Sequence, residues 1–218
     1  MKKFFLIIIF FLNFNFIHVF SVEPDVFVQS TVNRASTILS KDMSKEDKIN
    51  ELKEIAKETV DIKGVGFYSL GPVRKNLNVN QKLRYSKLFE SYFLKSFSSR
   101  LAEYTNPEIE VQGKEMLNKN YTIVNSLLIA TSDRPEIKID WRIYTKNPNN
   151  PLIRDLIIEG LSLARTQKEE FSSILNSNDG DINVLFKTLE EFSNNWNKIF
   201  FGGPARTRTW DQYIMSVL

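Results

Sequence analysis

The sequence contains no cysteine, and its one histidine, His18, lies close to the N-terminus. Without cysteine the chain has no disulfide bond, no thiolate nucleophile and no thiolate metal site. If His18 is removed with a leader peptide, no imidazole is left either. Ser-His-Asp and Cys-His catalytic systems and the common zinc and iron sites are then excluded, so we expect neither a metal nor a cofactor.

Residues 1–21 are typical of a cleaved signal peptide. Lys2 and Lys3 give a basic start, residues 4–12 form an unbroken apolar run, and Val19-Phe20-Ser21 offers a cleavage site. The alternative is an uncleaved membrane anchor, but polar residues interrupt the run well before the roughly 20 apolar residues that a membrane span needs. With no cysteine after the run, a lipoprotein anchor is excluded, and we expect an exported protein.

Charge gives no indication of a nucleic-acid partner. The net charge is +3, of which Lys2 and Lys3 contribute two, and residues 201–218 contain two arginines and one aspartate. Residues 4–200 are therefore neutral overall. No basic field remains to attract nucleic acid or an anionic membrane surface.

Apolar spacing predicts helices on both sides of a block of strands. Apolar residues recur at helical spacing over residues 22–40 and 44–60, a short helix or turn and a loop follow, and a helix of about 25 residues begins at Asn78. That helix is long enough to cross one whole face of a small sheet. Two further helices are expected at residues 162–175 and 181–192.

The pattern between these helices changes to alternation with period 2. It predicts a strand that starts at 109–111 and others at 121–131, 137–143 and 152–159, with Gly160 ending the sheet. Short connections between consecutive strands favour an antiparallel sheet. We therefore predict one α+β domain over residues 22–200: a twisted antiparallel sheet of about four strands, wrapped by N- and C-terminal helices and enclosing an apolar pocket. Residues 201–218 show no periodicity, and we expect them to be disordered or loosely packed.

One segment matches part of a hydrolase motif. Gly160-Leu-Ser162-Leu-Ala164 lies where a G-x-S-x-G nucleophile elbow would lie, but alanine replaces the last glycine and no histidine is available. We expect Ser162 to cap a helix instead. Asp155 and Glu159 lie four residues apart on one strand, too far apart for paired catalytic carboxylates. Asp155 and Asp140 are expected to pair with Arg142 or Arg154 across the sheet.

Three segments together resemble the MlaC (toluene-tolerance) family of periplasmic phospholipid-binding proteins from Gram-negative bacteria. They are the helix Leu88–Leu94, the strand Ile139–Ile143 and the run Arg154–Phe171, and the pattern Asp155…Glu159-Gly160-Leu161-Ser162…Thr166-Gln167 is the most specific part. The resemblance covers about residues 25–195. It implies a carrier that hides acyl chains in a buried pocket and shuttles phospholipid between an outer-membrane lipoprotein–porin complex and an inner-membrane ABC transporter with a lipid-binding domain.

On this interpretation the pocket lies between the long aromatic helix and one face of the sheet, and the carrier is a monomer. The candidate lipid-binding residues are Phe89, Phe93, Phe97, Val124, Leu128, Ile139, Trp141, Ile143 and Ile157. The phenylalanines are equally compatible with plain core packing, and a slip of one residue in any strand would exchange its two faces. Two other functions stay open: an enzyme on a related cone-shaped α+β fold that acts on a small apolar substrate, and an adaptor whose apolar groove accepts a partner helix.

Overall fold

The computed structural model describes residues 21–104, 107–132 and 134–202, with the side chains of its last helix up to residue 194. The predicted leader (1–21) and tail (201–218) lie almost wholly outside these ranges and stay predictions. The helices are α1 (Pro24–Ser40), α2 (Lys45–Thr59), α3 (Ile62–Ser69), the 3₁₀ helix η1 (Gly71–Lys75), α4 (Val79–Leu101), α5 (Leu163–Asn176) and α6 (Ile182–Gly202). The strands are β1 (Ile109–Asn118), β2 (Tyr121–Leu128), β3 (Ile137–Tyr144), β4 (Leu152–Ile158) and β5 (Leu161–Ser162).

Local hydrogen bonds fix where the helices begin. At the start of α4 the Asn78 side chain accepts from the Gln81 backbone N–H (2.9 Å), and the Gln81 side chain accepts from the Asn78 backbone N–H (3.0 Å). This reciprocal box satisfies two N–H groups that a helix start leaves without partners. Ser44 caps α2 by accepting from the backbone N–H of Asp47 (3.1 Å). Both predicted helix starts are confirmed, whereas α6 runs to Gly202, beyond the predicted end at residue 192.

The five strands form a simple antiparallel meander in the order β1-β2-β3-β4-β5. The predicted α+β fold with an antiparallel sheet is confirmed, with one correction at its end. Gly160 does not end the sheet: Glu159 and Gly160 adopt positive φ angles of 48° and 84° and turn the chain into the two-residue strand β5. Glycine tolerates this left-handed conformation without a Cβ penalty. The sheet therefore has a fifth strand. With two residues, this strand is too short to produce an alternation pattern in the sequence.

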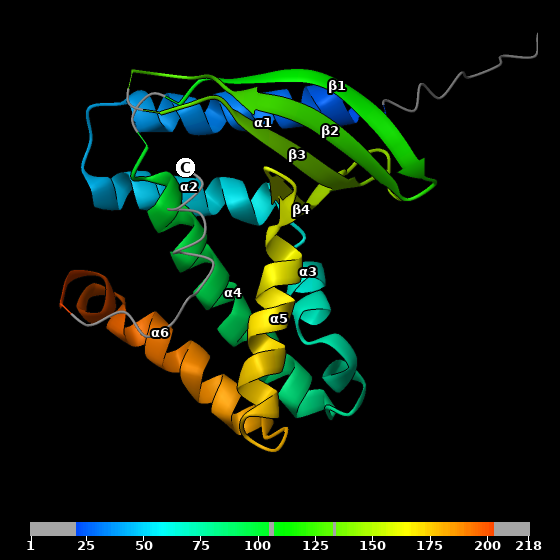
Figure 1. Ribbon diagram of the computed structural model, residues 1–218, viewed down its shortest axis with the longest axis vertical. Coiled ribbons are helices and arrows are strands. Elements are labelled where there is room, and N and C mark those ends of the chain that lie inside the picture. Colours follow the sequence, from blue (N-terminus) through cyan, green and yellow to red (C-terminus); the bar gives the residue numbers. More distant parts are fainter. Residues whose placement is uncertain (1–20, 105–106, 133, 203–218) are drawn as a thin grey trace, which may run out of the picture.

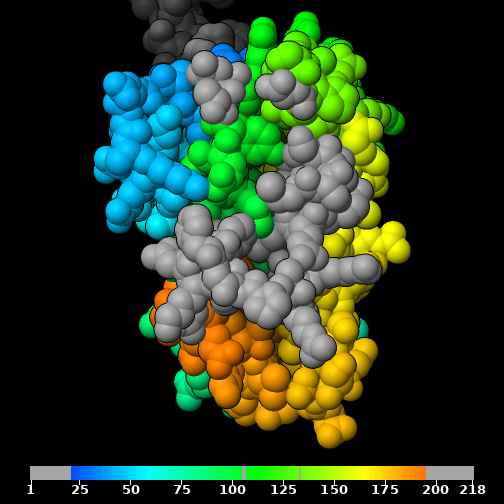
Figure 2. Space-filling model, turned by 60° about the vertical axis from the view of Figure 1, so that its left-hand side comes forward, coloured from blue at the N-terminus to red at the C-terminus, as the bar shows by residue number. Residues whose placement is uncertain are grey.

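The helices are divided between the sheet and a separate layer. Helix α1 packs along β1 and β2, α2 packs on α1, and α4 makes its main contacts with α2, α3 and α6 (Figure 1). Figure 2 shows one face of the molecule, in which α1 and α2 (blue to cyan) lie in the upper half and α6 (orange) lies in the lower half. The expectation that the long helix crosses the sheet is therefore wrong. Helix α1 covers the sheet, and α4 reaches it only with its C-terminal end.

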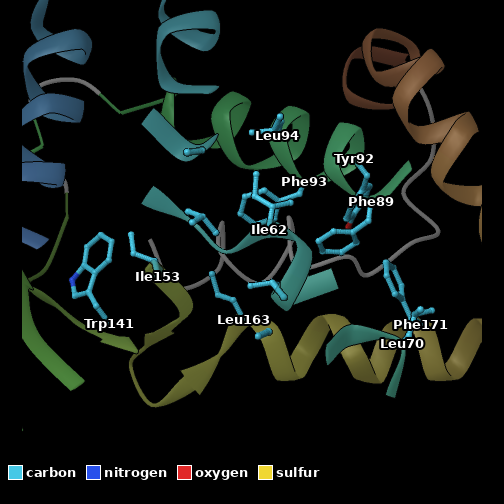
Figure 3. Packing of buried hydrophobic residues seen from close by; sticks show 14 of the residues in the cluster. Ile62, Leu70, Phe89, Tyr92, Phe93, Leu94, Trp141, Ile153, Leu163 and Phe171 are labelled. Atoms are coloured by element: carbon cyan, nitrogen blue, oxygen red, sulfur yellow. The ribbon is translucent and has the colours of Figure 1, made fainter. Parts of the chain in front are cut away.

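One apolar core joins the sheet to the helical layer. It runs from Trp141 on β3 and Ile153 on β4, past Phe93 and Phe89 on α4, to Phe171 on α5 (Figure 3). Phe89 is almost completely buried, and its ring packs 6.2 Å, centroid to centroid, from that of Phe171. The rings of α4 therefore serve mainly to attach α4 to its neighbouring helices.

A glycine on α3 tests this packing. A Cβ built on Gly66 would lie 2.7 Å from Phe89 Cδ1, whereas a Cβ on Gly113 in β1 would meet nothing within 4 Å. Because Phe89 is enclosed, overpacking should outweigh the gain in helix propensity, and we expect Gly66→Ala to lower the free energy of unfolding by about 1–3 kcal/mol. Gly113→Ala is the control and should change it by less than about 0.5 kcal/mol in urea denaturation. A Gly66→Ala protein as stable as the control would contradict this view of the core.

Candidate functional site

A cavity of about 130 Å³ lies between the inner face of the sheet and helices α1, α2 and α4. It is bounded by apolar positions on α1 and α2, by the last turns of α4, by all four long strands and by the first residue of α5. The lining residues are Thr31, Val32, Ala35, Ser36, Leu39, Leu52, Ile55, Ala56, Thr59, Val60, Phe97, Arg100, Leu101, Tyr104, Pro107, Ile109, Leu128, Ile139, Trp141, Ile153, Leu156, Ile158 and Leu163. The space is thus enclosed mainly by hydrocarbon.

The threonine and serine hydroxyls in this lining are already hydrogen-bonded. Thr31 donates to the carbonyl of Phe27 (2.8 Å), and Thr59 donates to the carbonyl of Ile55 (2.8 Å). Ser36 donates to the carbonyl of Pro107 (2.9 Å). A buried water needs two to four polar partners, and an apolar cavity without them stays dry. The cavity is therefore suited to an apolar guest.

The helices that cover the cavity are attached to the sheet at the β1 edge by side chains of α1. Gln29 accepts from the backbone N–H of Val111 (3.2 Å). Near the start of α1, Lys114 of β1 pairs with Asp25 (2.8 Å) and with Glu23. These polar contacts hold α1 beside the sheet without filling the space beneath it.

The second attachment is at the β4 edge. Val60, directly after α2, forms a β-bridge with Ile153, and the backbone N–H of Asp61 donates to the carbonyl of Ile153 (2.9 Å). Asp61 also caps α3 through Gly64 (2.8 Å) and accepts from Arg154 Nε (2.6 Å). Helices α1 and α2 are thus fixed to the sheet at its β1 edge and at its β4 edge, and the cavity lies between these two attachments.

A smaller cavity of about 40 Å³ continues this space toward the helical layer. Phe97, Trp141 and Ile153 line both cavities, and Phe93 lines only the smaller one. The rings of Phe93 and Phe97 are stacked with their centroids 5.4 Å apart. The apolar space therefore extends from the sheet along one side of α4.

The structure brings five of the nine candidate lipid-binding residues to these two cavities. Phe97, Leu128, Ile139 and Trp141 line the larger cavity, and Phe93 lines the smaller one. Trp141 Nε1 donates to Ser126 Oγ (2.8 Å), so its indole presents an apolar surface with no unsatisfied N–H group. That these five side chains contact lipid stays a prediction.

The other four candidates line neither cavity. Phe89 is buried in the helical layer, and Val124 and Ile143 are fully buried in the core. Ile157 is partly buried and lies on the opposite face of β4 from its neighbour Ile158, which lines the larger cavity. For these four residues a role in lipid binding is likewise untested.

A β-bulge explains why the facing of β4 was hard to predict. Ile143 pairs with Ile153, but Arg142 pairs with Asp155, so the sequence of β4 contains one extra residue at this point. The extra residue reverses the alternation, and Leu156 and Ile158 come to share the cavity with Ile153. Sequence reasoning also missed the contribution of α1 and α2 to the lining, although the stripes that contain Ala35 and Ala56 were visible at helical spacing.

The segment that resembled a nucleophile elbow has a structural role. Ser162 caps α5 by accepting from the backbone N–H of Arg165 (3.1 Å), as predicted, and donates its hydroxyl to Asp155 (2.6 Å). Asp155 also accepts from the backbone N–H of Ala164 (2.9 Å) and pairs with Arg142 (3.0 Å), which confirms the predicted ion pair. Burial raises the pKa of Asp155, and these hydrogen bonds and the Arg142 charge offset only part of the rise.

The expected partner of Asp140 was wrong. Its carboxylate accepts from Asn125 Nδ2 (2.8 Å) and lies 3.6 Å from Lys138 Nζ, whereas Arg154 pairs with Asp61.

Across residues 21–104, 107–132 and 134–202, no group of three or more His, Cys, Asp or Glu side chains is placed to hold a metal ion. Within the same ranges, no helix combines the length and apolar character that a membrane crossing requires.

Comparison with known proteins agrees with this geometry. A phospholipid-binding protein from Ralstonia solanacearum, solved in complex with a phospholipid, has the same fold: the TM-score is 0.69 at 17% sequence identity, over 81% of this chain and 100% of that chain. Among curated proteins, none matches the chain by sequence. The sequence profile of the MlaC protein family matches residues 29–191, which is most of the chain. The chain therefore belongs to the MlaC family.

Proposed function

We propose that the protein carries phospholipid through the periplasm, between an outer-membrane lipoprotein–porin complex and an inner-membrane ABC transporter with a lipid-binding domain. Membership of the MlaC family and the phospholipid bound to a protein of the same fold support lipid as the cargo. The observation that carries the proposal is the apolar cavity between the sheet and helices α1 and α2. We propose that the carrier acts as a monomer after its signal peptide is removed.

The energetics explain why such a cargo needs a protein cavity. Exposing an acyl chain to water costs about 0.8 kcal/mol per methylene, so a chain of about 15 methylenes faces a cost of about 12 kcal/mol. A carrier offsets this cost by burying the chain against apolar side chains. No catalytic group is needed for that task, and the hydroxyls of Thr31, Ser36 and Thr59 in the lining are engaged in hydrogen bonds to the backbone.

The two cavities, of about 130 and 40 Å³, are smaller than the pocket that a phospholipid requires. A cavity of about 150 Å³ holds one benzene molecule, and typical ligand pockets span about 300–1,000 Å³. Loading therefore requires the space between the sheet and helices α1 and α2 to widen. The polar contacts at the β1 edge are compatible with this, because exposed ion pairs contribute little stability.

The two alternative functions find less support in the described residues. Ser162, at the nucleophile position of the partial hydrolase motif, is engaged by Asp155 and by the start of α5, and Asp155 is buried in the same network. An adaptor for a partner helix would need an apolar groove about 10 Å wide on the surface. Here the apolar space lies inside the fold, between the sheet and the helices that cover it.

Extraction of the protein tests the proposed cargo. We expect protein purified from the periplasm without detergent to release phospholipid into organic solvent, in an amount close to one lipid per chain by mass spectrometry. Protein that was unfolded and refolded in the absence of lipid is the control and should release none. Fresh periplasmic protein that is folded but free of phospholipid would contradict the proposal.

A substitution that fills the cavity tests its location. Ala56 on α2 is buried and lines the larger cavity, so leucine at this position would occupy space that lipid is proposed to use. We expect Ala56→Leu to reduce the bound phospholipid several-fold and to leave the thermal stability of the lipid-free protein equal or higher, since filling a cavity commonly stabilises. Ala130→Leu makes the same change at an exposed position and should bind lipid normally. Equal lipid content in both variants would place the cargo elsewhere.

A further inference from the structure

The apolar space inside the protein continues toward the surface on the side of α3. Trp141, Ile153 and Leu163 line both the larger and the smaller cavity and lie near one another in Figure 3. The smaller cavity in turn shares Val65 and Arg154 with a groove of about 340 Å³. A space enclosed by hydrocarbon is thus connected, through shared lining residues, to a groove that contains a charged side chain.

This groove is formed by α3, the β1–β2 hairpin, β3, β4 and the start of α5. Its lining residues are Gly64, Val65, Tyr68, Leu117, Asn118, Tyr121, Arg142, Arg154 and Ala164. The charged residues of this lining are two arginines, Arg142 and Arg154. The apolar path therefore ends at a polar groove whose lining carries positive charge.

Arg142 is held by a carboxylate on one side only. Its Nη1 donates to Asp155 Oδ2 (3.0 Å), and this is the one hydrogen bond of the guanidinium within the described part of the chain, while its side chain is 37% exposed. Asp155 also accepts from the hydroxyl of Ser162 (2.6 Å) and the backbone N–H of Ala164 (2.9 Å). The carboxylate thus shares its charge among several donors, and the guanidinium keeps further N–H groups for a second anion.

Arg154 and Tyr121 form the other side of the polar groove. Arg154 donates through Nε to Asp61 (2.6 Å) and through Nη1 to the hydroxyl oxygen of Tyr121 (2.7 Å). Its guanidinium carbon also lies 4.0 Å from the centre of the Tyr144 ring. These contacts fix the orientation of Arg154, and the hydroxyl of Tyr121, which accepts from Arg154, keeps its own proton to donate.

We propose that Arg142 and Tyr121, with Arg154 beside them, bind the phosphate of the phospholipid head group in this groove. The assignment rests on the proposed function, because the acyl chains of the same lipid run from the groove through the smaller cavity into the larger one. A guanidinium and a phenol suit phosphate oxygens, which arginine binds in a bidentate manner. The groove supplies the selectivity for a phosphate, and the apolar lining supplies most of the affinity.

A second groove borders the larger cavity and fits this role less well. It lies between α1 and α2, has a volume of about 830 Å³, and shares Ile55 with the cavity. Arg34 and Lys41 line it, but so do Glu51 and Glu54. The negative charges of these two carboxylates repel a phosphate.

A phospholipid with a nitroxide on its head group tests where the phosphate lies. The mature protein is loaded with this lipid, and its methyl groups are observed by nuclear magnetic resonance. We expect stronger broadening for Leu117 and Val65, which line the groove, than for Leu39, which lines the larger cavity near the end of α1. The β1–β2 hairpin and the end of α1 lie on opposite sides of the molecule (Figure 1).

The same lipid without the nitroxide is the control for this measurement. Broadening of Leu39 with none at Leu117 would overturn the assignment of the head-group site. That outcome leaves lipid binding, and with it the proposed function, intact.

Lipids with identical chains test the donors. Protein stripped of lipid is offered equal amounts of dioleoyl phosphatidate and dioleoylglycerol, and the bound ratio is measured by mass spectrometry. We expect the wild-type protein to prefer phosphatidate. Arg142→Lys keeps a cation opposite Asp155 but removes the planar fork, and should lower the preference about tenfold. Tyr121→Phe keeps the ring beside Tyr144 and removes the hydroxyl, and should lower it by a smaller factor.

A matched control variant makes the result specific. Arg165→Gln removes an exposed arginine on α5 that pairs with Glu169, and its preference should equal that of the wild type. An unchanged preference in both Arg142→Lys and Tyr121→Phe would contradict the proposed site. So would inorganic phosphate that binds the lipid-free protein as tightly as phosphatidate does, because the site would then be one for free anions. Wild-type protein that takes up neither lipid would refute the proposed function itself, which is a different outcome.

Discussion

The cavity exists because helices α1 and α2 are fixed to the sheet at its two edges and not at its centre. At the β1 edge, Gln29 and Lys114 join α1 to the first strand, and at the β4 edge the bridge between Val60 and Ile153 joins the end of α2 to the fourth. Between these attachments, small side chains such as Ala35 and Ala56 face the inner surface of the sheet without filling it. A protein interior is normally close-packed, so an unfilled apolar space is costly and indicates a binding function.

The two attachments differ in strength, which bears on how a large guest enters. The β4 edge combines backbone pairing with a partly buried ion pair between Asp61 and Arg154, and α3 begins directly at Asp61. The β1 edge depends largely on exposed side chains, and such ion pairs contribute about 1 kcal/mol or less. The aromatic side chains of α4 also join α4 to α5 and α6, so these helices have contacts of their own besides those with α1 and α2.

Much of this fold follows from the sequence, because its signals are local. The apolar spacing that begins at residues 44 and 78, the cap at Ser162 and the alternation in β3 were sufficient to place helices and strands. The resemblance in the run Arg154–Phe171 indicated the family. The site was only partly predictable, because its lining depends on which helix covers the sheet. The helical period of 3.6 residues shows that α1 and α4 each have an apolar face, but it does not show which of the two helices covers the sheet. The one-residue bulge opposite Arg142 then reversed the facing of the following residues of β4.

The central claim is that acyl chains lie between α1, α2 and the inner face of the sheet. Nuclear magnetic resonance of the methyl groups, with a phospholipid that carries a nitroxide at the end of one acyl chain, tests it directly. We expect strong broadening of the methyl signals of Ile139, Leu52 and Ile158, which line the larger cavity, and little effect on Leu185 and Leu189, which are buried on α6. Broadening confined to Leu185 and Leu189 would show that the chains occupy the helical layer instead and would contradict the claim.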